Sequence, residues 1–329
     1  MQYIDLHPSL PAWMSALESR LSSFFDGEYA VIRDAGLTVV TSRGKRLRPL
    51  MLLLSCAGFS DITARATNFA AVIELIHTAS LAHDDVVDEA DSRRGVPSAP
   101  ARWGSKFSIL LGDFFFTRVF DVATSDGDQR ILRLLATTAT EMTRAVILEY
   151  TNLQLDDSEE RYWQIVHGKT AMLFAAATAI GSIIGGATPD QQEAALNFGE
   201  QFGNAFQLAD DLMDLQGSEH ETGKPLGVDW RQRRATLPLI AALRQSSPDA
   251  AAEIRALWQS DPFTDEHLSA LRYRVDSAGG FEYCWQKVKE YRGEACGYLA
   301  SFPAGPGRDA LMHLCRDAFP LPVMPTVRS

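Results

Sequence analysis

The amino-acid sequence predicts an all-α fold. Helical signals occur along most of the 329 residues, and no alternation of period two is long enough to indicate a sheet. The longest signal covers residues 66–89, which contain no Gly or Pro and place apolar side chains at steps of three and four. Hydrophobic residues make up 46% of the chain, enough for a substantial core. We expect one helical domain over residues 1–329, a bundle around a central cavity.

Turn residues separate the expected helices from one another. Clusters rich in Gly, Pro, Ser and Asp lie at residues 92–100, 125–128, 217–227 and 246–249. A second long helix is expected over residues 190–216, directly after Pro189, with Gly199 and Gly203 at close helix contacts. Further helices are expected near residues 11–25, 47–57, 106–124, 129–154, 159–184, 236–245 and 281–302.

Residues 170–188 carry no charge over a length close to that of a membrane-spanning helix. The stretch is rich in Ala, Gly and Thr instead of Leu and Ile, and no comparable stretch accompanies it. Its glycines, Gly181 and Gly185, would equally allow close helix packing in a soluble protein. We therefore expect a buried core helix and no transmembrane segment.

Charge and cysteine content narrow the class of protein. A net charge of −11 and a pI near 5.1 argue against non-specific binding of nucleic acid and against attachment to anionic membranes. The N-terminal residues lack the basic start and apolar run of a signal peptide. The cysteines show no CxxC spacing, so neither a zinc site nor a disulfide framework is expected. The expected location is a reducing cytoplasm; the cysteines are Cys56, Cys284, Cys296 and Cys315.

Two copies of one acidic motif, DDVVD and DDLMD, are embedded in apolar helical stretches. The first and last aspartates of each motif are four residues apart, so they share a helix face and can bind one cation between them. Oxygen ligands suit Mg²⁺, which prefers one or two carboxylates plus substrate phosphates to a complete protein cage. A single copy would be explained as well by a solvated acidic face. Two copies indicate magnesium and diphosphate chemistry; the six residues are Asp84, Asp85, Asp88, Asp210, Asp211 and Asp214.

Cationic residues that could bind a diphosphate accompany both motifs. Lys45, Arg46 and Arg48 belong to GKRLRP at a loop-to-helix junction, where three basic side chains could grasp a phosphate. The alternative is a basic solvated turn. His77 lies seven residues before the first motif and either donates to a second phosphate or is a core histidine. Further candidate cations are Arg93, Arg94, Lys169, Lys224 and Arg234.

An ordered series of motifs resembles the trans-isoprenyl (polyprenyl) diphosphate synthases. The series comprises GKRLRP, HTASLAHDDVVDEADSRRG, GDFFF, KTAMLF, FQLADDLMD and GKPLG followed by TLPL, over roughly residues 30–300. The resemblance implies the class I isoprenoid synthase fold, a homodimer, and two aspartate motifs that face each other across a deep cavity. It also implies condensation of isopentenyl diphosphate with an allylic diphosphate, with Mg²⁺ as cofactor.

The resemblance further implies a role for each matching residue. The main Mg²⁺ ligands would be Asp84, Asp88 and Asp210, supported directly or through water by Asp85, Asp211 and Asp214. The allylic diphosphate would contact Arg93, Lys169 and Arg234. Isopentenyl diphosphate would contact Lys45, Arg48, His77 and Arg94. The reacting carbons would be flanked by Thr170, Gln207 and Lys224. Pyrophosphate is the expected acceptor of the final proton.

Product length depends on the helix that carries the first motif. Ala79 and Ser80, one turn before Asp84, would line the path of the growing chain, and in short-chain relatives bulky aromatics there act as a floor. Both residues are small here, which predicts a product beyond the fifteen- or twenty-carbon stage. Deeper stops would be Ile76, Phe115 or Phe120, unless a neighbouring helix or the partner subunit closes the path.

The leading hypothesis is a long-chain all-trans polyprenyl diphosphate synthase that supplies a quinone side chain. The alternatives are a short-chain farnesyl or geranylgeranyl diphosphate synthase and a regulatory subunit of a heteromeric synthase. Regulatory subunits typically lose aspartates, whereas this chain keeps all six. A terpene cyclase is disfavoured because that class usually carries an Asn/Ser/Glu metal motif in place of the second DDxxD.

Overall fold

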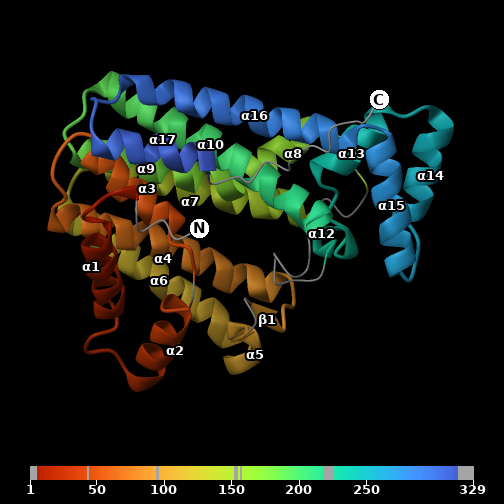
Figure 1. The fold of residues 1–329 in the computed structure, drawn as a ribbon. Coiled ribbons are helices and arrows are strands. Elements are labelled where there is room, and N and C mark those ends of the chain that lie inside the picture. Colours follow the sequence, from red (N-terminus) through yellow and green to blue (C-terminus); the bar gives the residue numbers. More distant parts are fainter. Residues whose placement is uncertain are drawn as a thin grey trace. The chain divides into compact units, whose positions relative to one another are not determined.

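The computed structural model describes residues 6–42, 44–93, 96–151, 155, 158–217 and 226–317. Helices dominate these residues, which confirms the all-α prediction (Figure 1). A small hairpin is the exception: β1 (Ser92–Arg93) pairs antiparallel with β2 (Val96–Pro97). Two residues per strand are too few to produce a period-two pattern, so sequence periodicity does not reveal this hairpin.

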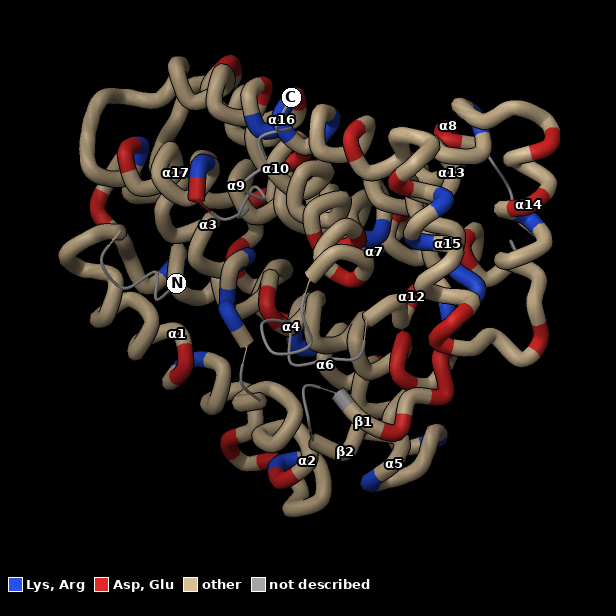
Figure 2. Tube along the Cα trace, turned by 45° about the vertical axis from the view of Figure 1, so that its right-hand side comes forward, with Lys and Arg blue, Asp and Glu red and all other residues tan. Residues whose placement is uncertain are grey.

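The chain forms two compact units. Unit 1 comprises Met1–Ala139, Leu173–Gly199 and Tyr298–His313, and unit 2 comprises Thr140–Met172, Glu200–Gly297 and Leu314–Ser329. One domain over the whole chain stays a prediction. Acidic and basic residues are interspersed along the helices of the described chain (Figure 2).

The central helix of unit 1 is α4 (Ala64–Val87), which packs against α1, α3 and α6. Thr63 caps its first turn, because the Thr63 hydroxyl accepts a hydrogen bond from the backbone N–H of Ala66. Most of α3 is buried, so its leucines supply much of this core. The helices from this part of the chain are α1 (Leu10–Ser23), α2 (Ala30–Val40), α3 (Leu47–Ala57), α5 (Ala99–Trp103) and α6 (Ser105–Asp126).

Small residues bring α9 (Met172–Ile184) against α3, as the sequence predicts. A Cβ atom on Gly181 would lie 2.2 Å from the carbonyl oxygen of Leu52, and one on Gly185 would lie 2.9 Å from that of Cys56. The expectation of a buried core helix is confirmed, since the α9 residues Leu173–Ile183 are buried. In the part of the chain that the structure describes, no helix is long and apolar enough to cross a membrane.

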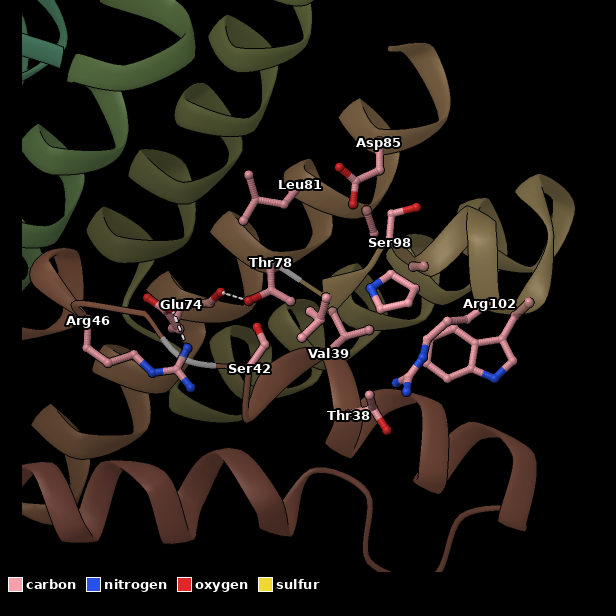
Figure 3. Close-up of a pocket in the computed structure, with 15 residues that line it drawn as sticks. Thr38, Val39, Ser42, Arg46, Glu74, Thr78, Leu81, Asp85, Ser98 and Arg102 are labelled. Carbon is pink, nitrogen blue, oxygen red and sulfur yellow. Dashed lines mark hydrogen bonds and ion pairs between the residues drawn. The ribbon is translucent and has the colours of Figure 1, made fainter. Parts of the chain in front are cut away.

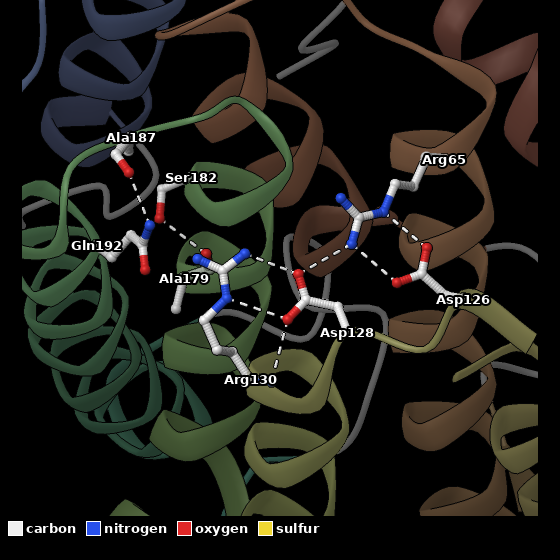
Figure 4. A network of polar contacts seen from close by, with 8 residues as sticks. All are labelled: Arg65, Asp126, Asp128, Arg130, Ala179, Ser182, Ala187 and Gln192. Carbon is white, nitrogen blue, oxygen red and sulfur yellow. Dashed lines mark hydrogen bonds and ion pairs between the residues drawn. The ribbon is translucent and has the colours of Figure 1, made fainter. Parts of the chain in front are cut away.

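Within unit 1, an ion-pair network joins α4 to the junction between α6 and the start of α7 (Figure 4). Helix α7 comprises Gln129–Tyr150. Arg65 forms a bidentate pair with Asp126 at 2.7 and 2.8 Å and also contacts Asp128 at 3.2 Å. Arg130 binds the same Asp128 carboxylate at 2.8 Å. Hydrogen bonds from Arg130, and then from Arg65, lower the pKa of Asp128, so this carboxylate stays charged and fixes the junction.

One of the expected helices is divided into three segments in the structure. The expected helix over residues 159–184 is divided into α8 (Glu159–Val166), the π-helix η2 (His167–Ala171) and α9. Single-turn π segments often occur at functional sites. The long helix α10 (Pro189–Gln216) begins and ends close to its predicted bounds.

Several helices in the described ranges were not predicted, and those with at least ten residues are α2, α14, α15 and α17. In α15 the structure shows a capping box made with a histidine: the Thr264 hydroxyl accepts from the backbone N–H of His267, and the His267 ring accepts from the backbone N–H of Thr264. The remaining elements of the C-terminal half are α12 (Val228–Arg231), α13 (Leu237–Gln245), α14 (Pro248–Trp258), α15 (Asp265–Ser277), α16 (Gly280–Tyr298), η3 (Leu299–Ser301) and α17 (Pro306–Asp317).

Candidate active site

The first aspartate motif lies at the carboxyl end of α4 in unit 1. Val87 is the last residue of this helix, and the backbone N–H of Asp88 donates to the carbonyl of Asp84 at 2.8 Å, one turn back. The side chains of Asp84 and Asp88 are both partly exposed. Carboxylates at the carboxyl end of a helix face the negative pole of its dipole, an unfavourable position that a bound cation would relieve.

Asp85 occupies different surroundings from its neighbours in the motif. It is only 3% exposed and lines a pocket of about 70 Å³ together with Thr78 and Ser98 (Figure 3). Consecutive residues on a helix point about 100° apart, so Asp85 does not share the face of Asp84. A pocket of this size holds at most a few water molecules. A direct Mg²⁺ contact by Asp85 stays a prediction, and its burial favours a positioning role.

Two of the predicted contacts to isopentenyl diphosphate meet between α3 and α4. The Arg48 Nη1 atom lies 3.4 Å from His77 Nε2, and the Arg48 guanidinium stacks over the ring of Phe174 at 4.4 Å. Stacking holds the planar guanidinium in one orientation, which favours bidentate recognition of a phosphate. Lys45 is exposed in the loop just before α3.

Arg46 does not belong to a phosphate-binding group, which corrects one expectation from the sequence. Its side chain is 7% exposed and forms an ion pair with Glu74 at 2.6 Å (Figure 3). A second ion pair joins it to Glu18 at 2.8 Å. Arg46 also donates to the Val40 carbonyl. Despite burial, the two glutamates raise the pKa of Arg46. Because these carboxylates already neutralise Arg46, the prediction that all three basic side chains of GKRLRP grasp a phosphate is wrong for this residue.

The second motif, in unit 2, gives its first two aspartates opposite environments. Asp210 is exposed on α10, whereas Asp211 is 4% exposed. Asp211 accepts hydrogen bonds from the Tyr162 hydroxyl at 2.7 Å and from the Gln207 amide at 2.8 Å. Burial, and then the nearby Asp229 carboxylate, raise the pKa of Asp211 well above its usual range.

This network reaches two residues that were predicted to flank the reacting carbons. The hydroxyl of Thr170, in η2, donates to the side-chain oxygen of Gln207 at 2.8 Å. Gln207 in turn donates to Asp211, so a continuous chain of hydrogen bonds fixes the orientation of both side chains. The structure therefore brings Thr170 and Gln207 together, as their shared predicted role requires.

Asp214, the last member of the second motif, caps α12. Its carboxylate accepts from the backbone N–H groups of Val228 at 3.2 Å and Asp229 at 3.3 Å. The capped helix positions Asp229, a partly buried carboxylate that sequence reasoning missed. Burial and then the Asp214 charge raise the pKa of Asp229 to about 6. Its position just after GKPLG, in the first turn of a helix, was the available signal.

Two predicted contacts to the allylic diphosphate are joined by a second residue that sequence reasoning missed. Lys169 Nζ lies 2.5 Å from Oε2 of Glu149, and Arg234 Nε lies 3.9 Å from Oε1 of the same carboxylate. Arg234 also approaches Asp229 at 3.8 Å. No motif includes Glu149, which lies near the end of α7, so only the folded chain reveals this pairing.

The predicted chain-length residues lie on α4. Ala79 is fully buried, and Ser80 is partly exposed with its hydroxyl donating to the His77 carbonyl at 2.8 Å. Of the proposed deeper stops, Ile76 and Phe115 are buried. Phe120 is 53% exposed on α6, so it does not line a buried path within unit 1. Arg94, Lys224 and the side chain of Arg93 lie outside the described residues.

The carboxylates present suit Mg²⁺ bound together with a diphosphate. Among the described residues, no group of three or more His, Cys, Asp or Glu side chains is arranged to hold a metal ion. Mg²⁺ commonly takes one or two carboxylates and completes its shell with water and substrate phosphates. The pair Asp84 and Asp88 and the exposed Asp210 are oxygen donors of that kind.

Comparison with known proteins decides the family. The polyprenyl synthetase family model matches residues 30–273. The chain belongs to the polyprenyl synthetase family. The predicted enzyme class, a trans-polyprenyl diphosphate synthase, is thereby confirmed, and the helical fold agrees with solved structures of the family.

Relatives within the polyprenyl synthetase family extend over nearly the whole chain. Octaprenyl diphosphate synthase of Escherichia coli is 33% identical over 93% of this chain and 94% of its own. A decaprenyl diphosphate synthase from Rhodobacter capsulatus superposes with a TM-score of 0.87 at 34% identity, covering 95% of this chain and 97% of its own. A polyprenyl synthase from Caulobacter crescentus, solved with calcium and isoprenyl diphosphate, gives a TM-score of 0.84 at 32% identity and covers 94% and 95%.

Proposed function

We propose that this protein is a Mg²⁺-dependent prenyltransferase that condenses isopentenyl diphosphate with an allylic diphosphate to make a long-chain all-trans polyprenyl diphosphate. One observation carries the proposal: two DDxxD motifs occupy the carboxyl-terminal turns of the long helices α4 and α10. Acidic groups are unfavourable there unless cations bind them. The octaprenyl and decaprenyl synthases among the relatives support a long product.

In this proposal Asp84, Asp88 and Asp210 hold the magnesium ions. When bound, Mg²⁺ supplies positive charge that offsets the charge developing on the departing diphosphate. The relative solved with calcium and isoprenyl diphosphate supports a divalent cation at this kind of site. Asp211 and Asp214, whose oxygens accept hydrogen bonds from Tyr162 and from the α12 backbone, position the second motif.

The chain's own residues orient the two substrates. Lys169 and Arg234, with Arg93, bind the allylic diphosphate, whereas Arg48 and His77, with Lys45 and Arg94, bind isopentenyl diphosphate. Thr170, Gln207 and Lys224 flank the reacting carbons, with the first two held by their mutual hydrogen bond. These contacts place the alkene of isopentenyl diphosphate beside the carbon that loses pyrophosphate.

The proposed condensation consists of ionisation, attack by the alkene and loss of a proton. The allylic carbon–oxygen bond breaks and its electron pair leaves with pyrophosphate, which the cationic side chains stabilise. The alkene attacks the resulting allylic cation and forms the new carbon–carbon bond. Loss of a proton to pyrophosphate regenerates an alkene, so the product is an allylic diphosphate longer by five carbons. Apolar walls exclude water, which would otherwise trap the cation as an alcohol.

Product length provides a separate test on α4. We expect Ala79→Phe to shorten the product by one or more five-carbon units, because the aromatic ring would block the path beside a fully buried position. Ser80→Ala is the matched control, since it keeps the neighbouring side chain small and should leave the product unchanged. Chromatography of the extracted products measures their chain length. Products of unaltered length from Ala79→Phe would show that the growing chain does not pass this residue.

A homodimer is also part of the proposal. Three apolar side chains on α6 are exposed: Ile109 at 42%, Leu110 at 64% and Phe120 at 53%. Ile109 and Phe120 are eleven residues apart, about three helical turns, so they lie on one side of α6. We propose that a second copy of this chain covers this exposed apolar side. Light scattering should give twice the chain mass. We place the enzyme in the cytoplasm, where its free cysteines would remain reduced.

The direct test is incubation of the pure protein with isopentenyl diphosphate, a set of allylic primers and Mg²⁺, followed by mass measurement of the products. The proposal expects long all-trans polyprenyl diphosphates. A fifteen- or twenty-carbon end product would favour the short-chain alternative. Turnover that requires a second, different subunit would favour the regulatory alternative.

A further inference from the structure

We propose that Glu149 is a positioning residue for the allylic diphosphate, whose carboxylate holds Lys169 and Arg234 at the spacing that one diphosphate group requires. The inference rests on the proposed function, because it assigns both cations to that substrate. Glu149 itself lies in none of the sequence motifs.

The contacts of one carboxylate carry the proposal. Glu149 Oε2 lies 2.5 Å from Lys169 Nζ, and its Oε1 lies 3.9 Å from Arg234 Nε. The two cations come from distant segments, η2 and the turn after α12, and this carboxylate brings them together. A shared anion between two cations reduces their mutual repulsion and allows both to approach the same ligand.

The partial exposure of these side chains leaves them accessible to a ligand. The exposed fractions are 26% for Glu149, 27% for Lys169 and 28% for Arg234. Long Lys and Arg side chains otherwise sample many rotamers, and ordering them at the moment of binding would weaken affinity. An ion pair formed before the substrate arrives removes part of that cost.

Backbone packing explains why Glu149 lies beside Lys169. A Cβ atom on Gly168 would be 2.6 Å from both the Glu141 carbonyl oxygen and the Ala145 Cβ atom, so η2 lies directly against α7. Glu141, Ala145 and Glu149 are four residues apart and therefore share one face of α7. The same close contact that requires glycine at position 168 places the Glu149 carboxylate next to the following residue, Lys169.

Steady-state kinetics of Glu149→Ala test the inference. We expect the KM for the allylic diphosphate to rise about tenfold, with kcat and the KM for isopentenyl diphosphate changed less than about twofold, because the residue acts on one binding step. Glu149→Gln keeps an acceptor oxygen and the side-chain shape, so it should recover part of the lost affinity. Glu141→Ala, which removes a carboxylate paired with Arg144 on the same helix, is the matched control and should behave as wild type.

Binding of inorganic pyrophosphate with Mg²⁺, measured by calorimetry, gives a readout that does not depend on turnover. Glu149→Ala should bind pyrophosphate several-fold more weakly than wild type and Glu141→Ala. An unchanged allylic KM and pyrophosphate affinity, or tighter binding by Glu149→Gln, would overturn the inference. Equal changes in all kinetic parameters with a lowered melting temperature would also overturn it, as they indicate general damage. If wild type makes no prenyl product, the proposed function fails. The pyrophosphate affinities of wild type and Glu149→Ala would still test whether Glu149 positions the two cations.

Discussion

At the scale of single residues, neighbouring carboxylates in one motif have different tasks. Asp210 is exposed, Asp211 is buried between Tyr162 and Gln207, and Asp214 caps the backbone of α12. Each step along a helix turns the side chain by about 100°, so adjacent aspartates meet different surroundings. The motif therefore combines an exposed carboxylate, the proposed cation ligand, with residues that fix the local structure around it.

Substitution of the two adjacent aspartates separates these tasks. We expect Asp210→Ala to abolish Mg²⁺-dependent turnover while changing the free energy of unfolding by less than about 0.5 kcal/mol, since the side chain is exposed. Asp211→Ala should instead cost about 1–3 kcal/mol, because it leaves the Tyr162 hydroxyl and the Gln207 amide without their acceptor. Urea denaturation and turnover assays on both variants check this, and equal destabilisation by the two would contradict it.

The sequence was sufficient to locate most candidate site residues but not their pairings. The spacing of Asp84 and Asp88 predicts that they share a helix face, and the structure places both at the carboxyl end of α4. Spacing says nothing about contacts between distant segments. Glu149 was missed for that reason, and Arg46 was misjudged because Glu18 and Glu74 approach it only in the folded chain. Asp229 was missed although it closely follows GKPLG.

At the scale of elements, small residues determine how closely helices approach. Gly181 on α9 meets the backbone of α3, and Gly199 on α10 meets Thr178 on α9, where a Cβ atom would lie 2.2 Å from the hydroxyl oxygen. Backbone atoms cannot move aside as the end of a flexible side chain can. The position of α3, and with it Arg48, therefore depends on a glycine far away in the sequence.

Gly181→Ala tests this dependence against a second glycine. The added methyl group would lie 2.2 Å from the Leu52 carbonyl oxygen, so we expect a loss of about 1–3 kcal/mol in the free energy of unfolding. Gly293→Ala is the control, because Gly293 lies within α16 and a methyl group added there would meet no atom within 4 Å. That control should stabilise the protein by up to about 1 kcal/mol. Thermal unfolding of both variants measures these changes in stability. An unchanged stability in Gly181→Ala would contradict the packing account.

Helix prediction succeeded where the apolar period was long and failed where it was short or polar. α4 and α10 are long enough for several apolar repeats to show, whereas α15 is strongly polar and gives no such repeat. Its capping box gives no sequence signal either, because the third helical residue is His267 instead of Glu or Gln. The π-helix η2 was also missed, because the sequence pattern around it continues as an ordinary helix. Its residue Gly168 packs closely against α7, a contact between separate segments that no local signal encodes.

At the scale of the whole molecule, the proposed chemistry depends on both motifs acting on one diphosphate. The first motif belongs to unit 1 and the second to unit 2. The proposed function therefore requires that the two units bring their motifs to the same substrate. Each unit holds part of the proposed machinery by itself: Arg48 lies beside His77 in unit 1, and Glu149 joins Lys169 and Arg234 in unit 2.

The most direct test is a crystal structure of the protein with Mg²⁺ and an allylic thiolodiphosphate, an analogue whose carbon–sulfur bond resists ionisation. We predict that Asp84, Asp88 and Asp210 would hold the magnesium ions together with the bound diphosphate. Metal ions bound elsewhere, or a diphosphate that contacts only one of the two motifs, would contradict the account.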